Sequence, residues 1–187
     1  ERWTEAFTYL RLAADKARGR SAHPQATMYL DRTLAALAHL PESGDRDALA
    51  VDLRMDLRQS FYLLGDTARS LATLAEAERL AEALGDGRRL GWVTLYVGEN
   101  QRLIGDLADA RRCYGRARAL AEAVDDVGLR AAAAHYLGIA VHLAGEYRTS
   151  VELFREVGHE PRAFEGFRLA SGSAVAGHAV NAAFLAR

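Results

Sequence analysis

Two histidines, His135 and His142, have the spacing in this sequence that comes nearest to that of a metal site. They are seven residues apart and therefore share one face of a helix, but a rise of about 1.5 Å per residue separates them by roughly 10 Å along its axis. That is too far for both to bind one metal ion, and no carboxylate or cysteine stands at ligand spacing beside them. We interpret both as groove-facing or partly buried side chains and predict no metal site.

Nucleophilic and phosphate-binding chemistry has as little support. Cys113 stands next to Arg111 and Arg112 but has no neighbouring base, which favours a structural thiol. The only lysine, Lys16, follows "LAAD" and not a glycine-rich loop, and "GSAVAG" at 172–177 lacks the glycine spacing of a dinucleotide-binding turn. The sequence therefore predicts neither enzyme activity nor a cofactor for this chain.

The overall composition is typical of a water-soluble helical protein. Half of the 187 residues are apolar, 26% are charged, and the net charge is −1, which argues against nucleic acid or an anionic membrane as the main partner. One cysteine cannot form an intrachain disulfide, and no apolar run approaches the ~20 residues of a membrane span. We expect a cytoplasmic location. Because the chain starts without Met and stops inside an apolar helical pattern, we also expect it to be a piece of a longer protein.

A recurring glycine followed by an acidic residue organises the chain. It occurs at Gly65, Gly105 and Gly145, at a constant interval of 40 residues, and a fixed period of this length indicates a repeat architecture. Apolar residues on both sides of each glycine follow the helical period, and no stretch shows the period of a strand. Glycine can end one helix and the acidic residue can cap the next, so each repeat is predicted to be an antiparallel helical hairpin.

The predicted repeats cover most of the chain. Helices are expected over 22–39, 47–64, 67–84, 88–104, 107–124, 128–144 and 147–157. The repeats are placed at 5–44, 47–86, 87–126 and 127–158, with a partial repeat over 159–187. In that last part we expect a long loop near 158–171 and a helix from about Ser173.

Equivalent positions of the repeats carry matching side chains. Seven residues before each glycine stand Arg58, Gly98 and Gly138; five after it stand Ser70, Ala110 and Ser150; nine after it stand Leu74, Tyr114 and Phe154. Small residues at the first position after the glycine let two helices approach, and large ones at the second fill the gap, so the last three are predicted to be buried.

This pattern of Leu-Gly, Gly-Asp and a small–aromatic–small second helix resembles the tetratricopeptide (TPR) repeat. The resemblance implies an all-α fold, a right-handed α-solenoid of antiparallel helix pairs, although the usual repeat is about 34 residues long. The chain departs from the pattern where the first helix usually carries a Trp, because Arg54, Thr94 and Ala134 stand there.

A narrower resemblance is carried by "RSAHPQATMYLDRTLAALAHLPES", "AVDLRMDLRQSFYLLGD" and "LAEALGDGRRLGWVTLYVGENQRLIGD". These stretches are similar to the C-terminal TPR region of bacterial proteins that join a class III adenylate/guanylate cyclase domain to an AAA-type ATPase. The similarity spans most of 15–157. It implies that cyclase and ATPase chemistry, where present, lies upstream of this chain.

The TPR resemblance also implies a concave groove lined by the first helix of each repeat. Carried onto this sequence, the groove positions are Asp52, Met55, Gln59, Tyr62, Trp92, Leu95, Glu99, Arg102, His135 and His142, together with Ala132 and Ile139. Aromatic, charged and amide groups in this mixture suit a peptide or a small polar ligand. Longer helices than usual could instead shift the register and make some of these residues part of the core.

We therefore expect a protein-interaction or regulatory scaffold that binds a peptide or protein partner, or the upstream domains of its own protein. The alternative is a helical domain that senses a small-molecule effector, as in ATPase-type transcription regulators. A closed apolar pocket would favour the small molecule and an open channel the peptide. The apolar residues Val180, Phe184 and Leu185 near the C-terminus further predict dimerisation through that end.

Overall fold

The computed structural model describes residues 2–158. Within them the chain forms eight helices and no strand, which confirms the all-helical prediction and adds α1 to the seven helices expected from the sequence. The helices are α1 (Arg2–Gly19), α2 (His23–Leu37), α3 (Gly44–Leu63), α4 (Thr67–Leu84), α5 (Gly87–Leu103), α6 (Leu107–Ala123), α7 (Val127–Leu143) and α8 (Tyr147–Gly158). The loop, helix and dimer contacts predicted for the C-terminal segment lie outside the described residues.

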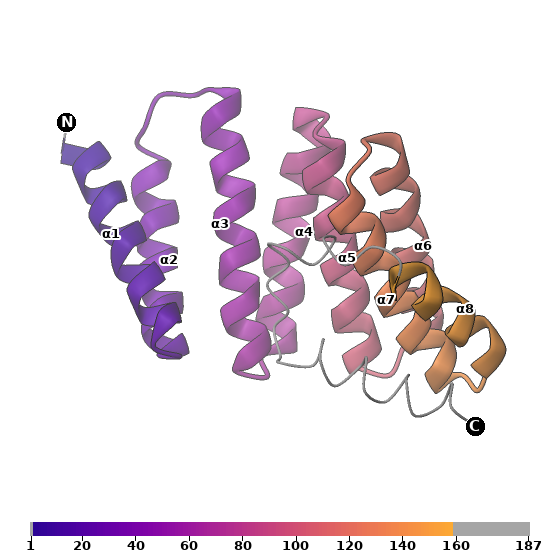
Figure 1. The fold of residues 1–187 in the computed structure, drawn as a ribbon. Helices are drawn as coiled ribbons and strands as arrows, with labels where there is room; N and C mark the ends of the chain where they lie inside the picture. The colour runs from indigo at the N-terminus through magenta and orange to yellow at the C-terminus, as the bar shows by residue number, and fades with distance from the viewer. Residues whose placement is uncertain (1, 159–187) are drawn as a thin grey trace. The chain divides into compact units, whose positions relative to one another are not determined.

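The chain divides into two compact units, Glu1–Val93 and Thr94–Arg187, with the boundary inside α5. In unit 1, α1 packs on α2, α2 on α3 and α3 on α4, and Figure 1 shows each helix running antiparallel to the one before it. In unit 2, α7 packs on both α6 and α8. Successive helix pairs therefore stack in chain order inside each unit, which is how a repeat protein buries the apolar faces of single hairpins.

The glycine turns are where the sequence placed them. Gly65, Gly105 and Gly145 lie between the two helices of a pair, with φ of 72°, 89° and 82°. This left-handed conformation is the one that glycine adopts without steric cost. Gly85, between successive pairs, has φ 64° and closes α4, while the non-glycine residue Asp125 has φ 51° at the corresponding place after α6.

The aspartate after four of these five positions caps the helix that follows, whereas the carboxylate of Glu146, after Gly145, is bonded to Arg111. The carboxylate of Asp66 accepts a hydrogen bond from the backbone N–H of Arg69, and Asp86, Asp106 and Asp126 each bond the N–H three residues on. A carboxylate there accepts a hydrogen bond from an N–H group that has no partner within the helix. Its negative charge is also attracted to the positive end of the helix dipole.

One helix boundary differs from the prediction. We expected the third helix to start near residue 47 after a loop over 41–47, but α3 begins at Gly44. The hydroxyl of Ser43 accepts a hydrogen bond from the N–H of Arg46, and Asp45 and Asp47 lie in the first helical turn. A cap and two acidic residues at the N-terminus stabilise this extra turn despite its glycine.

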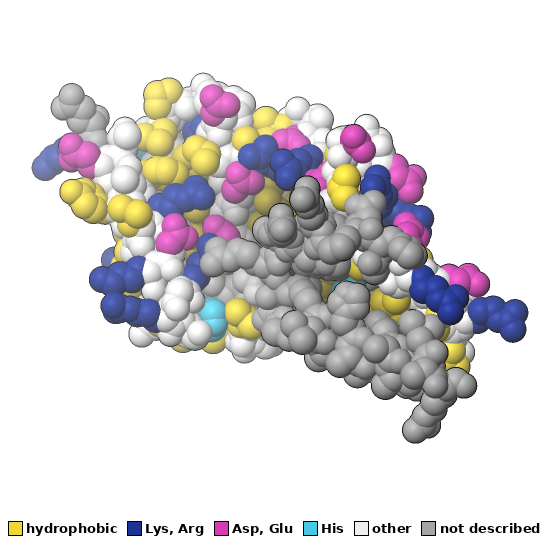
Figure 2. All heavy atoms as spheres, in the orientation of Figure 1, with side chains coloured by type: hydrophobic (Ala, Val, Ile, Leu, Met, Phe, Trp, Pro, Cys, Tyr) yellow, Lys and Arg dark blue, Asp and Glu magenta, His cyan; other side chains and the backbone are white. Residues whose placement is uncertain are grey.

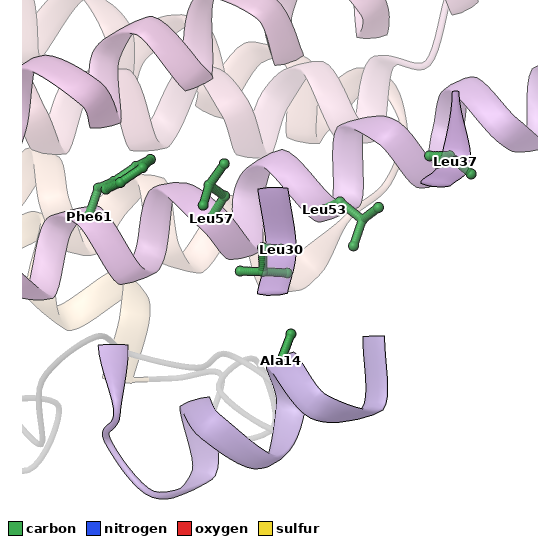
Figure 3. Close-up of a cluster of buried hydrophobic side chains, with 6 residues drawn as sticks. All are labelled: Ala14, Leu30, Leu37, Leu53, Leu57 and Phe61. Atoms are coloured by element: carbon green, nitrogen blue, oxygen red, sulfur yellow. The ribbon is translucent and has the colours of Figure 1, made fainter. Parts of the chain in front are cut away.

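The core of unit 1 is built from the inward faces of its first three helices. Figure 3 shows Leu53, Leu57 and Phe61 following one another along α3, with Ala14 opposite Leu30. All of these side chains are at most 4% exposed. Residues of α3 at intervals of four thus supply one continuous apolar stripe.

The predicted packing residues are buried to different degrees. Leu74 and Tyr114 have no exposed surface, which confirms their assignment, whereas Phe154 is only half-buried. A Cβ atom on Gly98 would lie 2.7 Å from the Tyr114 ring, and one on Gly138 would lie 2.9 Å from the Phe154 ring. The two glycines therefore provide the space in which the aromatic rings lie.

Candidate functional site

The described residues hold no group of three or more His, Cys, Asp and Glu side chains that could bind a metal ion. His135 packs edge-on against Phe154 and Tyr136, with ring centroids 5.6 and 5.5 Å apart, and His142 does so against Tyr147 at 5.1 Å. Cys113 is half-buried and is not part of a disulfide among the described residues. No helix in the described part of the chain is long and apolar enough to cross a membrane.

Five of the twelve groove residues proposed from the sequence belong to unit 1. Asp52, Met55, Gln59 and Tyr62 follow one another at intervals of three or four along α3, which places them on one side of that helix. Each is half-buried, and so is Trp92 on α5. All five therefore keep some surface in contact with solvent.

Asp52 is joined to a residue that the sequence reasoning missed. Both of its carboxylate oxygens accept hydrogen bonds from Arg89, at 2.9 Å from Nε and 2.8 Å from Nη2. The third guanidinium nitrogen of Arg89 binds Asp86 at 2.6 Å. These bonds, first of all those to Asp52, raise the pKa of Arg89 above its ordinary value. The only signal in the sequence was the separation of 37 residues, which is close to one repeat.

A second ion pair joins α1 to the same side of α3. Arg18 Nη1 lies 2.7 Å from an oxygen of Asp56, which is one turn beyond Asp52. Burial raises the pKa of the Asp56 carboxyl, and the positive charges of Arg18 and Arg11 oppose that shift. Figure 2 shows basic and acidic side chains next to one another among hydrophobic ones on the face of unit 1 turned toward the viewer.

The groove residues proposed in unit 2 are more enclosed. Leu95 is 0% and Glu99 2% exposed, and His135 is 8% exposed, while Arg102 and His142 are half-buried. Leu95 and Glu99 thus have essentially no surface available to a ligand in this structure. Ala132 is also fully buried, and as ligand contacts all twelve residues named from the sequence remain proposals.

Tyr114 lies at the centre of the packing in unit 2. The sequence analysis predicted its burial but did not consider its hydroxyl group. Its ring lies against Gly98 and stacks on Tyr136, with centroids 5.7 Å apart. No described acceptor receives its hydroxyl hydrogen. Burial raises the pKa of this hydroxyl above its ordinary value, the charge of Arg102 opposes the shift and that of Glu99 adds to it.

No protein-family model and no curated protein sequence matches the chain. Several solved structures, in contrast, are similar to it. RapI in its apo form has a TM-score of 0.73 at 10% identity and matches 82% of this chain and 54% of its own. The Rap conjugation gene regulator of plasmid pLS20, in complex with the Phr* peptide, has a TM-score of 0.73 at 17% identity, over 83% of this chain and 42% of that one.

A third solved structure is matched over most of its own length. The TPR-like repeats of a kinesin light chain from Podosopora anserina have a TM-score of 0.62 at 17% identity, over 91% of this chain and 82% of theirs. The chain thus spans about half or less of the length of the Rap proteins. At such identities the likeness concerns the fold alone, and the fold is that of TPR-like helical repeat proteins.

Proposed function

We propose that this chain is a binding module that recognises a peptide, either free or as a segment of a protein partner. The observation that carries the proposal is the stripe of Met55, Gln59 and Tyr62 on one side of α3, which is held rigidly by the packed helices of unit 1 and remains half-exposed. Thioether, amide and aromatic groups on a preformed surface are well suited to peptide side chains and main chain.

The fold supports the same proposal. A TPR-like Rap protein of the same fold has been solved with the Phr* peptide bound, and another Rap protein with Competence and Sporulation Factor. Fold likeness alone does not transfer a ligand, so the surface chemistry of this chain must carry the argument. The described residues hold no group of His, Cys, Asp and Glu that could bind a metal ion, and binding is the function that the geometry supports best.

The test is selection from a displayed library of random peptides against the purified chain, followed by fluorescence anisotropy with the enriched sequences. We expect saturable binding with one peptide per chain. The absence of any enriched sequence, together with tight binding of a metabolite-sized molecule from a screen, would favour the small-molecule alternative instead.

The regulatory context proposed from the sequence needs its own experiment. Upstream cyclase and ATPase domains, which would make the binding module part of a signalling protein, are tested by sequencing the full-length transcript. A reading frame without such domains would leave the peptide-binding proposal in place and remove the cyclase context.

A further inference from the structure

The charged groups on one face of unit 1 are bound to each other. We define this A-helix face by Arg18 of α1, by Asp52, Met55, Asp56, Gln59 and Tyr62 of α3, and by Arg89 and Trp92 of α5. Asp52 receives two hydrogen bonds from Arg89, and Arg89 gives its third nitrogen to Asp86. A planar guanidinium that engages two carboxylates in this way has little capacity left for a ligand.

The second pair on the A-helix face is also closed. Arg18 lies 2.7 Å from Asp56 and 3.5 Å from Asp15, and its side chain is only 12% exposed. A charged ligand group would have to separate such a pair and leave one partly buried charge without its counter-ion. That exchange is unfavourable, because breaking an existing pair loses the attraction that offset its desolvation.

The groups on this side of α3 that remain for a ligand are uncharged. Met55, Gln59 and Tyr62 stand between and beyond the two aspartates on α3, and all three are half-buried. Gln59 accepts a hydrogen bond from Arg58 Nη1 at 3.2 Å through its carbonyl oxygen, and this bond does not use the two N–H donors of its amide group. The guanidinium of Arg58 lies 4.8 Å from the centre of the Tyr62 ring and fixes that ring from one side.

The length of this stripe sets the size of its ligand. From Met55 to Tyr62 the helix rises by roughly 10 Å. An extended peptide advances about 3.4 Å per residue, so the stripe accommodates about three residues. The amide of Gln59 lies between the two apolar ends, where it can donate to a main-chain carbonyl.

We propose that the stripe of Met55, Gln59 and Tyr62 on the A-helix face of unit 1 binds an extended, uncharged peptide segment of about three residues with at least one apolar or aromatic side chain. This inference rests on the proposed peptide-binding function and names the ligand chemistry for it. Asp52 is then a positioning residue that holds α5 against α3 through Arg89, and it does not contact the ligand.

The experiment uses peptides of about nine residues enriched from a random library on the whole chain. We expect the enriched sequences to share an uncharged apolar core. Raising the salt concentration from about 50 mM to about 500 mM should change their dissociation constant by less than about threefold, because screening weakens charge contacts and leaves apolar ones in place.

Variants distinguish the uncharged residues that are proposed to contact the peptide from the carboxylate that is held in an ion pair. Tyr62→Ala and Met55→Ala should each weaken binding by about tenfold, as expected for central apolar contacts. Asp52→Asn should stay within about threefold of wild type. Glu146→Gln is the matched control for loss of a carboxylate elsewhere, because it removes the ion pair between Arg111 of α6 and the residue that precedes α8. Met55→Ala keeps the test valid where Tyr62→Ala does not fold, and circular dichroism checks each variant.

Two results would overturn the inference while the proposed function stands. One is a set of enriched peptides with a shared charge and binding that weakens by about tenfold or more in high salt. The other is binding that Asp52→Asn abolishes in a folded protein, or that neither Met55→Ala nor Tyr62→Ala weakens. If no peptide is enriched at all, the proposed function fails and this inference with it.

Discussion

The two units fill the same pair of packing positions in opposite ways. In unit 1 the position seven residues before the turn glycine holds Arg58, and the one nine residues after it holds Leu74. In unit 2 the first position is Gly98, and later Gly138, and the second is Tyr114, and later Phe154. Arg58 and Leu74 are almost fully buried, as Tyr114 is.

This difference shows that the repeat conserves the register and not the side chain. A glycine leaves space for a ring, as the contacts of Gly98 with Tyr114 show, whereas a long arginine is accompanied by an aliphatic residue of moderate size. Protein interiors are close-packed, so a large ring at the second position requires a small residue at the first. The buried groups at these positions therefore differ in chemistry, with a guanidinium in unit 1 and a phenol in unit 2.

The largest effect is expected from removal of the central ring of unit 2. Tyr114→Ala should lower the free energy of unfolding by about 3–5 kcal/mol, because the ring is fully enclosed between Gly98 and Tyr136. Urea denaturation followed by circular dichroism measures this, and Leu74→Ala, the equivalent change in unit 1, is the comparison. A Tyr114→Ala protein that unfolds at the wild-type urea concentration would contradict the assigned register.

Adding a methyl group to the glycine should produce the next largest effect. Gly98→Ala is expected to cost about 1–3 kcal/mol, because its Cβ would lie 2.7 Å from the Tyr114 ring. Gly115→Ala on α6 is the matched control: with no atom near its Cβ position, it should stabilise the helix by up to about 1 kcal/mol.

A double variant sharpens this test. Combining Gly98→Ala with Tyr114→Leu replaces the ring by the leucine that unit 1 has at this position. Gly98→Ala should therefore cost less stability in a Tyr114→Leu background than in the wild type. If the two changes are simply additive, the glycine and the ring do not share one space, and the comparison between the units loses its physical basis.

Two serines at equivalent positions offer a smaller contrast. Ser150 Oγ donates a hydrogen bond of 2.9 Å to the carbonyl of Gly138, whereas the buried Ser70 Oγ has no hydrogen-bond partner among the described residues. Ser150→Ala should therefore cost about 1 kcal/mol, and Ser70→Ala should be neutral or slightly stabilising. Thermal unfolding of the two variants measures this difference, and equal losses would show that burial alone, without the hydrogen bond, determines the effect.

The smallest effect concerns pH. Burial raises the pKa of Tyr114 above its ordinary value of 10.0, so the folded chain keeps this proton in the range where the unfolded chain releases it. Its contribution to stability is complete below pH 10 and decreases as the pH rises further, by less than about 1 kcal/mol at pH 10.5. Urea denaturation of wild type and Tyr114→Phe at pH 8 and pH 10.5 tests this. A difference between the two proteins that stays constant with pH would exclude it.

The sequence predicted the helices and turns because those depend on local chemistry. The glycine at 65, 105 and 145 and, at the first two places, the aspartate after it act within one turn of the chain, so their effect can be predicted without knowing the packing. The early start of α3 was missed because Ser43 and Gly44 were interpreted as part of a loop, although the serine is a good capping residue.

The candidate site was predictable only in part, for a physical reason. Helical spacing shows that Asp52, Gln59 and Tyr62 share one side of α3, but not which side chain of another helix lies against them. The pairing of Asp52 with Arg89 is therefore visible only in the structure. The same limit applies to Glu99 in unit 2. Helical spacing predicted the side of α5 on which it lies, but only the structure shows that its side chain is buried there.

The shortness of the connections has a consequence for proteolysis. Within the described part of the chain, successive helices are joined by at most three residues, except between α2 and α3, where residues 38–43 form a longer connection. A protease must draw a stretch of extended chain into its active site, and tight turns with capped helix ends do not supply one. Nicking of the native protein at early times should therefore concentrate around Leu40, and cleavage elsewhere between residues 2 and 158 would report the opening of a helix.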